Sequence, residues 1–106
     1  MVRTPEQIWE PIAKHQLTGR DVTTGTGFGT NPGLRVSGKI FAMLVRGELV
    51  VKLPKDRVDD LVDTGVGRRF DAGKGRPMKE WVSVTTGAAR RWKALVEEAR
   101  SFVAGR

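Results

Sequence analysis

The sequence contains no cysteine, no tyrosine and a single histidine, His15. Without cysteine the fold cannot depend on disulfides or thiolate metal sites, and one histidine is too few for an ordinary zinc site. The same scarcity leaves few candidates for a general base or an activated nucleophile. We therefore expect no metal, no cofactor and no enzymatic activity, and the lack of cysteine fits a cytoplasmic protein.

Long apolar segments are also lacking. The longest unbroken apolar run is the six residues 40–45, whereas a membrane-spanning helix needs about 20. The N-terminal segment MVRTPEQIWEPIAKHQ carries acidic residues and proline where a secretory signal needs a continuous apolar stretch. The sequence therefore predicts neither a membrane span nor a signal peptide.

Positive charge is what the chain has in excess. It carries 19 lysines and arginines against 12 acidic residues, a formal net charge of +7 and a pI near 10.6. Long-range attraction then favours an anionic partner, which includes nucleic acid, an acidic protein surface or anionic lipid. The 106 residues suffice for one domain, 1–106, with one hydrophobic core.

The N-terminal part predicts a helix followed by a long loop. Thr4, Pro5 and Gln7 have the spacing of an N-cap, a first-turn proline and the third position of a capping box. Pro11 removes one helical hydrogen bond, so we expect it to kink or shorten this helix. Residues 17–33 are mostly Gly, Thr, Asn and Pro and are predicted to form a loop.

The stretch LRVSGKIFAMLVRGELVVKLP, residues 34–54, predicts three strands joined by tight turns. A two-residue turn at Arg46-Gly47 and a three-residue loop at 37–39 would place one apolar set on the core face. A two-residue loop at the latter position would turn Arg35 inward. The predicted core set is Leu34, Val36, Ile40, Ala42, Leu44, Leu49, Val51 and Leu53, and the opposite set is Arg35, Phe41, Met43, Val45, Glu48, Val50 and Lys52.

That opposite set is too apolar to face water, so we expect a helix to cover part of it. Residues 54–63 place Val58, Leu61 and Val62 at helical spacing, with Gly65 as the terminator. The other side of this short helix carries aspartates, which we interpret as a solvated face and not as a metal site. These aspartates are Asp56, Asp59, Asp60 and Asp63.

The C-terminal part predicts a strand over residues 80–84 and then an amphipathic helix. The apolar positions of this helix are Trp92, Leu95, Val96, Ala99, Phe102 and Val103. The expected fold class is therefore α+β: a small antiparallel sheet of four or five strands with an N-terminal helix, a short middle helix and a C-terminal amphipathic helix.

Two glycine-rich segments fail the spacing of nucleotide-binding loops. In the segment that ends GKGRP, five residues separate Gly67 from Gly73, and Gly75 stands where a P-loop needs a hydroxyl. The other segment, GTGFGTNPG, lacks the G-x-G-x-x-G spacing and continues into Asn-Pro where a helix should open. We expect a tight turn there that lets Phe28 enter the core.

The basic residues concentrate on the predicted sheet, its loops and the start of the last helix. Arg90 and Arg91 fall in the predicted first turn of that helix, where its dipole disfavours cations but a bound anion would meet free N–H groups. The predicted contacts are with a nucleic-acid backbone; the alternative is a protein-interaction module that docks through Phe41, Met43 and Val50. The candidate residues are Arg35, Lys39, Arg46, Arg68, Arg69, Lys74, Arg76, Lys79, Arg90 and Arg91.

The run GKIFAMLVRGELVVKLP, followed by a helix and then RRFDAGKGRPMKEWVSV, resembles the TfoX N-terminal domain family, which is related to the MmcQ/YjbR group of small bacterial proteins. The resemblance covers roughly residues 25–103. Two departures are that the chain ends at Arg106, without the C-terminal helical domain, and that residues 27–30 read GFGT where the family has Met-Phe-Gly-Gly. The matching positions are Phe28, Gly29, Gly38, Phe41, Lys52, Gly65, Phe70, Met78 and Trp81.

This resemblance implies an α+β domain of the double-wing kind that binds DNA or assists transcription. TfoX and Sxy proteins regulate natural competence together with the cyclic-AMP receptor protein. The resemblance therefore implies DNA or a transcription-regulator protein as the partner and no cofactor. With five or six phosphate contacts, binding would weaken steeply as salt rises.

Overall fold

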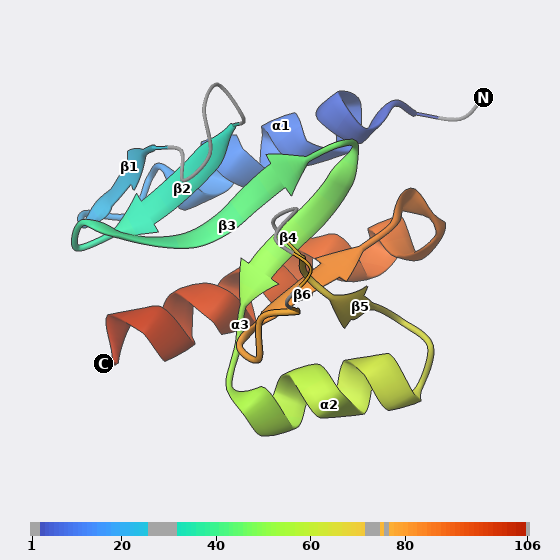
Figure 1. The fold of residues 1–106 in the computed structure, drawn as a ribbon. Helices are drawn as coiled ribbons and strands as arrows, with labels where there is room; N and C mark the ends of the chain where they lie inside the picture. The colour runs from blue at the N-terminus through green and yellow to red at the C-terminus, as the bar shows by residue number, and fades with distance from the viewer. Residues whose placement is uncertain (1–2, 26–31, 72–74, 76, 106) are drawn as a thin grey trace.

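The computed structural model describes residues 3–25, 32–71, 75 and 77–105. These residues form an antiparallel sheet of six strands in the order β1-β2-β3-β4-β6-β5, together with three α-helices and one 3₁₀ helix (Figure 1). The predicted α+β class is confirmed, with slightly more strands than expected. The elements are α1 (Pro5–Gln16), β1 (Val22–Thr24), β2 (Gly33–Val36), β3 (Lys39–Val45), β4 (Glu48–Lys52), α2 (Lys55–Asp63), β5 (Arg68–Arg69), β6 (Trp81–Val84), the 3₁₀ helix η1 (Thr86–Arg91) and α3 (Trp92–Ala104).

Helix α1 begins at the predicted capping box. The Gln7 N–H donates to the Thr4 hydroxyl at 3.1 Å, and the Thr4 N–H donates to the Gln7 side-chain oxygen at 2.9 Å. Pro11 lies inside the helix, which continues past it to Gln16. Ile8 and Trp9 before the proline are buried in the main core, and Ile12 and Ala13 after it pack against that core. These tertiary contacts stabilise the helix on both sides of Pro11.

The loop predicted for residues 17–33 contains a strand that the sequence pattern did not indicate. Strand β1 pairs with β2, with Val22 opposite Val36 and Thr24 opposite Leu34. Only Val22 of this three-residue strand is buried. The strand therefore has no alternation of apolar and polar residues long enough to distinguish it from a loop. The predicted core position of Phe28 lies outside the described residues.

The hairpin between β3 and β4 has the predicted two-residue turn. Val45 pairs with Glu48, and the turn residues Arg46 and Gly47 have φ angles of 50° and 77°. Positive φ at both central positions is the geometry that suits the twist of a tight hairpin. Ala42, Leu44, Leu49, Val51 and Leu53 consequently lie in the main core, as predicted.

The hairpin between β2 and β3 differs from its prediction. Val36 pairs with Lys39 across a two-residue turn at Ser37-Gly38, so the predicted three-residue loop is wrong. Leu34 then faces Ala42 while Arg35 faces Ile40, which makes Phe41 the extra residue of a β-bulge.

The bulge reverses the side-chain order of this part of β3. Phe41 joins the main core, whereas Ile40 packs with the second apolar cluster on the other face, the reverse of the prediction for both. Because the bulge restores the register, Leu34 and Val36 stay in the core even though the turn has two residues. Arg35 faces outward beside Ile40 for the same reason.

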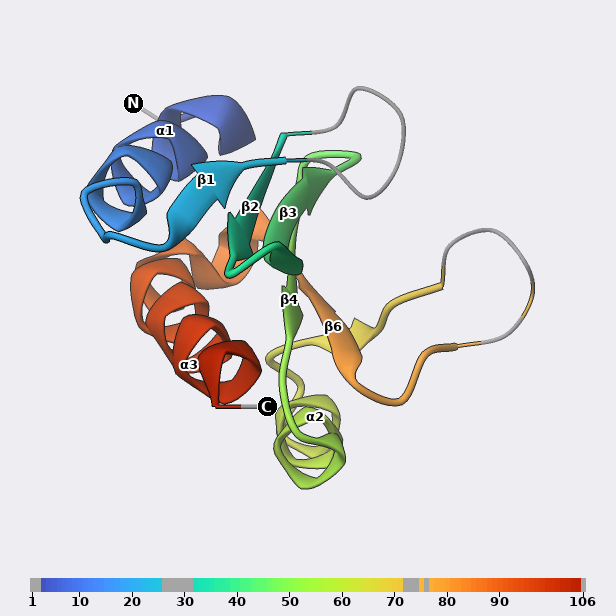
Figure 2. The ribbon, with the colours of Figure 1, turned by 90° about the vertical axis from the view of Figure 1, so that its left-hand side faces the viewer.

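All three α-helices contribute to the main core, and α1 and α3 lie on one side of the sheet (Figure 2). Val58 and Leu61 of α2 are buried as predicted. Gly65 follows the end of α2 with a φ of 78°, the left-handed conformation that suits a helix terminator. Five of the six apolar positions predicted for α3 are buried, and the sixth, Phe102, is partly buried and packs against the core. The five buried residues are Trp92, Leu95, Val96, Ala99 and Val103.

The other side of the sheet, which we call the helix-free face, carries a small second cluster of Met43, Val45, Val50 and Phe70, with Ile40 and Trp81 packed against it. Among the described residues no helix contributes to this cluster, so the expected helical cover is wrong. Phe70, which follows β5, takes part instead.

Two further predictions concern the start of the last helix and membrane-spanning segments. Arg90 and Arg91 belong to η1 and precede α3, so they are not in its first turn as predicted. Within the part of the chain that the structure describes, none of the helices has the length and apolar character that a bilayer crossing requires.

Candidate nucleic-acid interface

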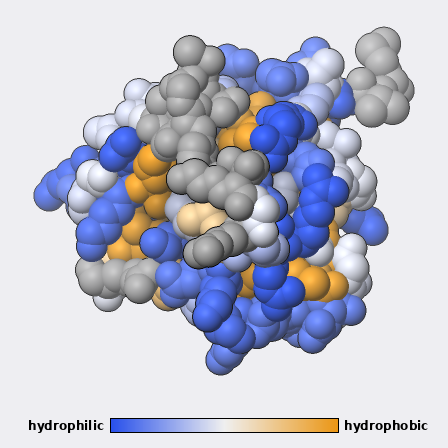
Figure 3. All heavy atoms as spheres, viewed as in Figure 1, coloured by the Kyte–Doolittle hydropathy of each residue, from blue (hydrophilic) through white to orange (hydrophobic). Residues whose placement is uncertain are grey.

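The helix-free face brings basic residues and one tryptophan together at one end of the sheet. Strand pairing sets Arg35 opposite Ile40, and Lys52 opposite Trp81. Successive side chains of a strand alternate between faces, so these positions share the face of the second cluster. Figure 3 views this face and shows apolar surface between hydrophilic side chains.

These residues line a hollow of about 560 Å³, which we call the sheet-end hollow; its lining is Arg35, Lys39, Ile40, Lys52, Trp81 and Val103. Val103 belongs to α3, so the hollow extends from the helix-free face around the end of the sheet. The Lys52 ammonium lies 5.7 Å from the centroid of the Trp81 ring, within cation–π distance. Arg35 donates from Nη1 to the Gly38 carbonyl at 3.0 Å, which ties its guanidinium to the neighbouring hairpin turn.

The charged residues among the described lining of the sheet-end hollow all have the same sign. Three of its described lining residues are cations, and none of the described ones is acidic. Its walls also contain apolar surface from Ile40 and Trp81. A hollow of this composition attracts an anion and offers an aromatic side chain beside it.

A second hollow, the ion-pair hollow, lies beside the β3–β4 turn and contains charges of both signs. Its described lining residues are Val45, Arg46, Glu48, Arg68, Arg69, Phe70, Asp71, Pro77 and Ser83. Arg68 donates from Nη2 to both carboxylate oxygens of Glu48 at 2.9 and 2.8 Å, and the Ser83 hydroxyl donates to the same carboxylate at 2.6 Å. Arg46 donates to the Asp71 carbonyl at 3.3 Å. The positive charge of Arg68 is therefore largely compensated within the protein.

Arg69 points to the middle helix, where its guanidinium pairs with Asp59. Lys55 also donates to Asp59, at 2.8 Å. The hydrogen bond from Lys55 has the largest effect on the pKa of the Asp59 carboxyl, followed by the one from Arg69. Both lower this pKa below its ordinary value. The interpretation of the aspartates as a solvated face therefore holds only in part, since Asp59 anchors β5 to α2.

The remaining predicted cations lie apart from the sheet-end hollow. Lys79 is exposed in the turn before β6, and Arg91 is exposed at the end of η1. Arg90 lines a separate groove between α1 and α3, which we call the α1–α3 groove. Lys74 and Arg76 lie outside the described residues.

The structure thus brings together Arg35 with Lys39, and Arg46 with Arg68, but it does not gather all the predicted cations at one place. The prediction missed Lys52 and Trp81 as site residues. The signal was present, because strand alternation places Lys52 on the same face as Arg35. Among the described residues there is no group of three His, Cys, Asp or Glu side chains placed to hold a metal ion.

No family model matches the chain, and no curated protein sequence matches it. The resemblance to the TfoX N-terminal domain family therefore stays a prediction based on the motifs of the sequence.

Proposed function

We propose that the protein is a non-catalytic nucleic-acid-binding protein of the cytoplasm that contacts backbone phosphates through the sheet-end hollow. The observation that carries this proposal is the placement of Arg35, Lys39 and Lys52 around Trp81 with no described carboxylate in the lining. Lysine and arginine contacts to phosphate supply affinity without reading base sequence. An accessory role in transcription, as the TfoX-like motifs imply, is compatible with such binding.

The tryptophan supports one class of nucleic acid over another. An unpaired base can stack on an aromatic ring while neighbouring cations hold the backbone, and such stacking is sequence-tolerant. A duplex keeps its bases stacked on one another and offers only its phosphates to the cations of this hollow. We therefore expect single strands to bind at least as tightly as duplexes of the same length.

The test is a titration of fluorescently labelled single-stranded and duplex oligonucleotides followed by anisotropy at several salt concentrations. We expect Lys39→Gln and Lys52→Gln each to weaken binding several-fold and to reduce the salt slope by about 0.7 to 0.9 for each phosphate contact that is lost. Lys14→Gln on α1 is the matched control, because Lys14 is exposed and does not line the hollow. Absence of binding at low salt, or equal losses with the control, would refute the proposal.

The alternative function, a protein-interaction module, needs a different surface from the predicted one. Phe41, Met43 and Val50 are 0%, 1% and 0% exposed, so they cannot contact a partner in this conformation. Met78, in contrast, is 37% exposed, and its backbone is hydrogen-bonded to Phe70 of the second cluster. Loss of a co-purifying protein on Met78→Ser, with nucleic-acid affinity unchanged, would favour this alternative.

A further inference from the structure

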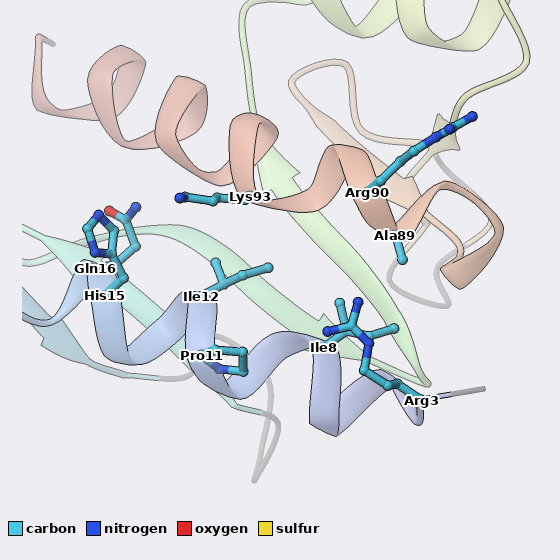
Figure 4. A pocket seen from close by; sticks show the side chains of 9 residues that line it. All are labelled: Arg3, Ile8, Pro11, Ile12, His15, Gln16, Ala89, Arg90 and Lys93. Atoms are coloured by element: carbon cyan, nitrogen blue, oxygen red, sulfur yellow. The ribbon is translucent and has the colours of Figure 1, made fainter. Parts of the chain in front are cut away.

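The α1–α3 groove has the features of a second binding site, on the side of the sheet that the helices cover. Its volume is about 350 Å³, which is at the lower end of the range for small-molecule sites. One wall comes from α1, and the other comes from η1 and the first turn of α3 (Figure 4). Ile8, Pro11 and Ile12 make the α1 wall apolar.

Gln16 closes one end of this groove and has an unusual hydrogen-bonding state. The residue is 1% exposed, and its side-chain oxygen accepts from Arg100 Nη1 at 3.3 Å. A guanidinium has only donors, so the amide oxygen must face Arg100 and the NH₂ group must face the other way. No partner for that NH₂ group is found among the described residues.

A buried amide without a partner costs stability unless a ligand or a water accepts from it. No fully buried side-chain polar atom lacks a partner in the described part of the chain, so the NH₂ group of Gln16 is not fully buried. Gln16 is one of the residues that line the groove. In Figure 4 the amide nitrogen lies on the side of Gln16 from which Lys93 approaches. The two groups together present donors from α1 and from α3 at one end of the groove.

The cations divide between the two ends of the groove. Lys93 extends along it toward His15 and Gln16, whereas Arg3 lies at the other end beside Ile8 (Figure 4). The Arg90 side chain points away from α1 in the same view. One acidic group stands near the Gln16 end: a carboxylate oxygen of Glu97 lies 4.0 Å from His15 Nε2.

We propose that the α1–α3 groove binds a small organic acid that carries an apolar body. The carboxylate accepts hydrogen bonds from the Gln16 amide and the Lys93 ammonium, and the body lies against Ile12, Pro11 and Ile8. A charged acceptor suits this end, because charge-assisted hydrogen bonds are stronger than neutral ones. The proposal does not depend on nucleic-acid binding, since the groove and the sheet-end hollow share no residue.

The probe for this site is phenylbutyrate, with phenylbutanol as the uncharged compound of the same shape. Titration of the nitrogen-labelled protein by two-dimensional NMR should shift the side-chain amide signals of Gln16 with the acid and much less with the alcohol. Equal shifts with both compounds would show a merely hydrophobic contact and overturn the proposal. Shifts confined to residues outside the groove would overturn it as well.

Two variants test the donors separately. Lys93 is exposed, so Lys93→Gln should leave the fold intact and weaken phenylbutyrate binding roughly fivefold, the factor for about 1 kcal/mol. Gln16→Glu keeps an acceptor for Arg100 but removes the NH₂ donors and adds a like charge, so it should weaken binding roughly tenfold or more.

The controls change charge without touching the donors. Lys14→Gln removes a cation from the same helix that does not line the groove, and it should leave the affinity unchanged. Glu97→Gln removes the nearby negative charge and should strengthen phenylbutyrate binding. Full affinity in Lys93→Gln, or an equal loss in Lys14→Gln, would overturn the proposed role of the ammonium.

Discussion

Arg57 of α2 and Glu98 of α3 form a two-point ion pair: Nε donates to Oε1 at 2.6 Å and Nη2 donates to Oε2 at 3.4 Å. The two side chains are 41 residues apart in sequence and only partly exposed, at 30% and 40%. Paired donors and acceptors fix the relative orientation of both groups. The contact therefore joins the middle helix to the C-terminal helix at the margin of the core.

We expect this pair to contribute about 1 kcal/mol to the free energy of unfolding, the upper part of the range for partly exposed ion pairs. A double-mutant cycle with Arg57→Ala and Glu98→Ala, followed by urea unfolding, measures the coupling. The matched cycle uses Asp60, which Arg57 also contacts, at 3.1 Å, but which is 62% exposed and on the same helix. A larger coupling in the Asp60 cycle would contradict the proposed importance of the contact between helices.

Acid should destabilise the protein partly through Asp59. Its pKa is lower in the folded protein than its ordinary value of 3.8, because Lys55 and Arg69 donate hydrogen bonds to the carboxylate. A carboxyl with a depressed folded-state pKa stabilises fully above its unfolded pKa and loses that contribution as the pH falls through the folded one. Urea unfolding at a series of acidic pH values should show a steeper decline for the wild type than for Asp59→Asn. Parallel profiles would contradict this assignment.

Glu48 should restrain nucleic-acid binding by holding Arg68. Glu48→Gln removes the negative charge but retains an oxygen that can accept from the Ser83 hydroxyl. We then expect Arg68 to become available for a phosphate, with tighter oligonucleotide binding at low salt and a salt slope larger by roughly one. Anisotropy titrations of the variant and of Glu97→Gln, which makes the same charge change on the helix side, provide the comparison. An equal gain in both would indicate only a change in net charge.

Gly47 should be needed for the tight β3–β4 turn. Its φ of 77° lies in the left-handed region, where a side chain costs about 1 kcal/mol or more. Gly47→Ala should lower the free energy of unfolding by that amount in a denaturant titration. Gly87→Ala is the control, because Gly87 has no positive φ and an added Cβ there would make only a 3.4 Å contact with the Thr85 hydroxyl. An equal loss in the control would contradict the conformational explanation.

Local signals were enough to predict most of the fold. The capping box of Thr4 and Gln7, the Arg46-Gly47 turn and the apolar stripe of α3 each depend on residues that are close in sequence. Such features need no knowledge of the rest of the chain, because the hydrogen bonds and the helical period involved span only a few residues. The α+β class and the order of most elements followed from them.

The candidate site was predicted only in part, for an equally physical reason. The sequence indicated that Arg35 and Lys39 lie on the sheet, but the bulge at Phe41 set which neighbours they share. The ion pairs of Arg68 with Glu48 and of Arg69 with Asp59 join residues 20 and 10 positions apart. No local pattern indicates such partners, so charge counting overestimated the cations available to a ligand.

The sequence by itself determined a small basic domain with no cysteine, a hairpin of fixed register and an amphipathic last helix, because composition and short-range periodicity are properties of the chain. Tertiary structure decided which face Ile40 and Phe41 occupy, which cations are compensated, and that Lys93 and Gln16 line the same groove. These outcomes depend on contacts between distant segments, and such contacts exist only after the chain has packed around one core.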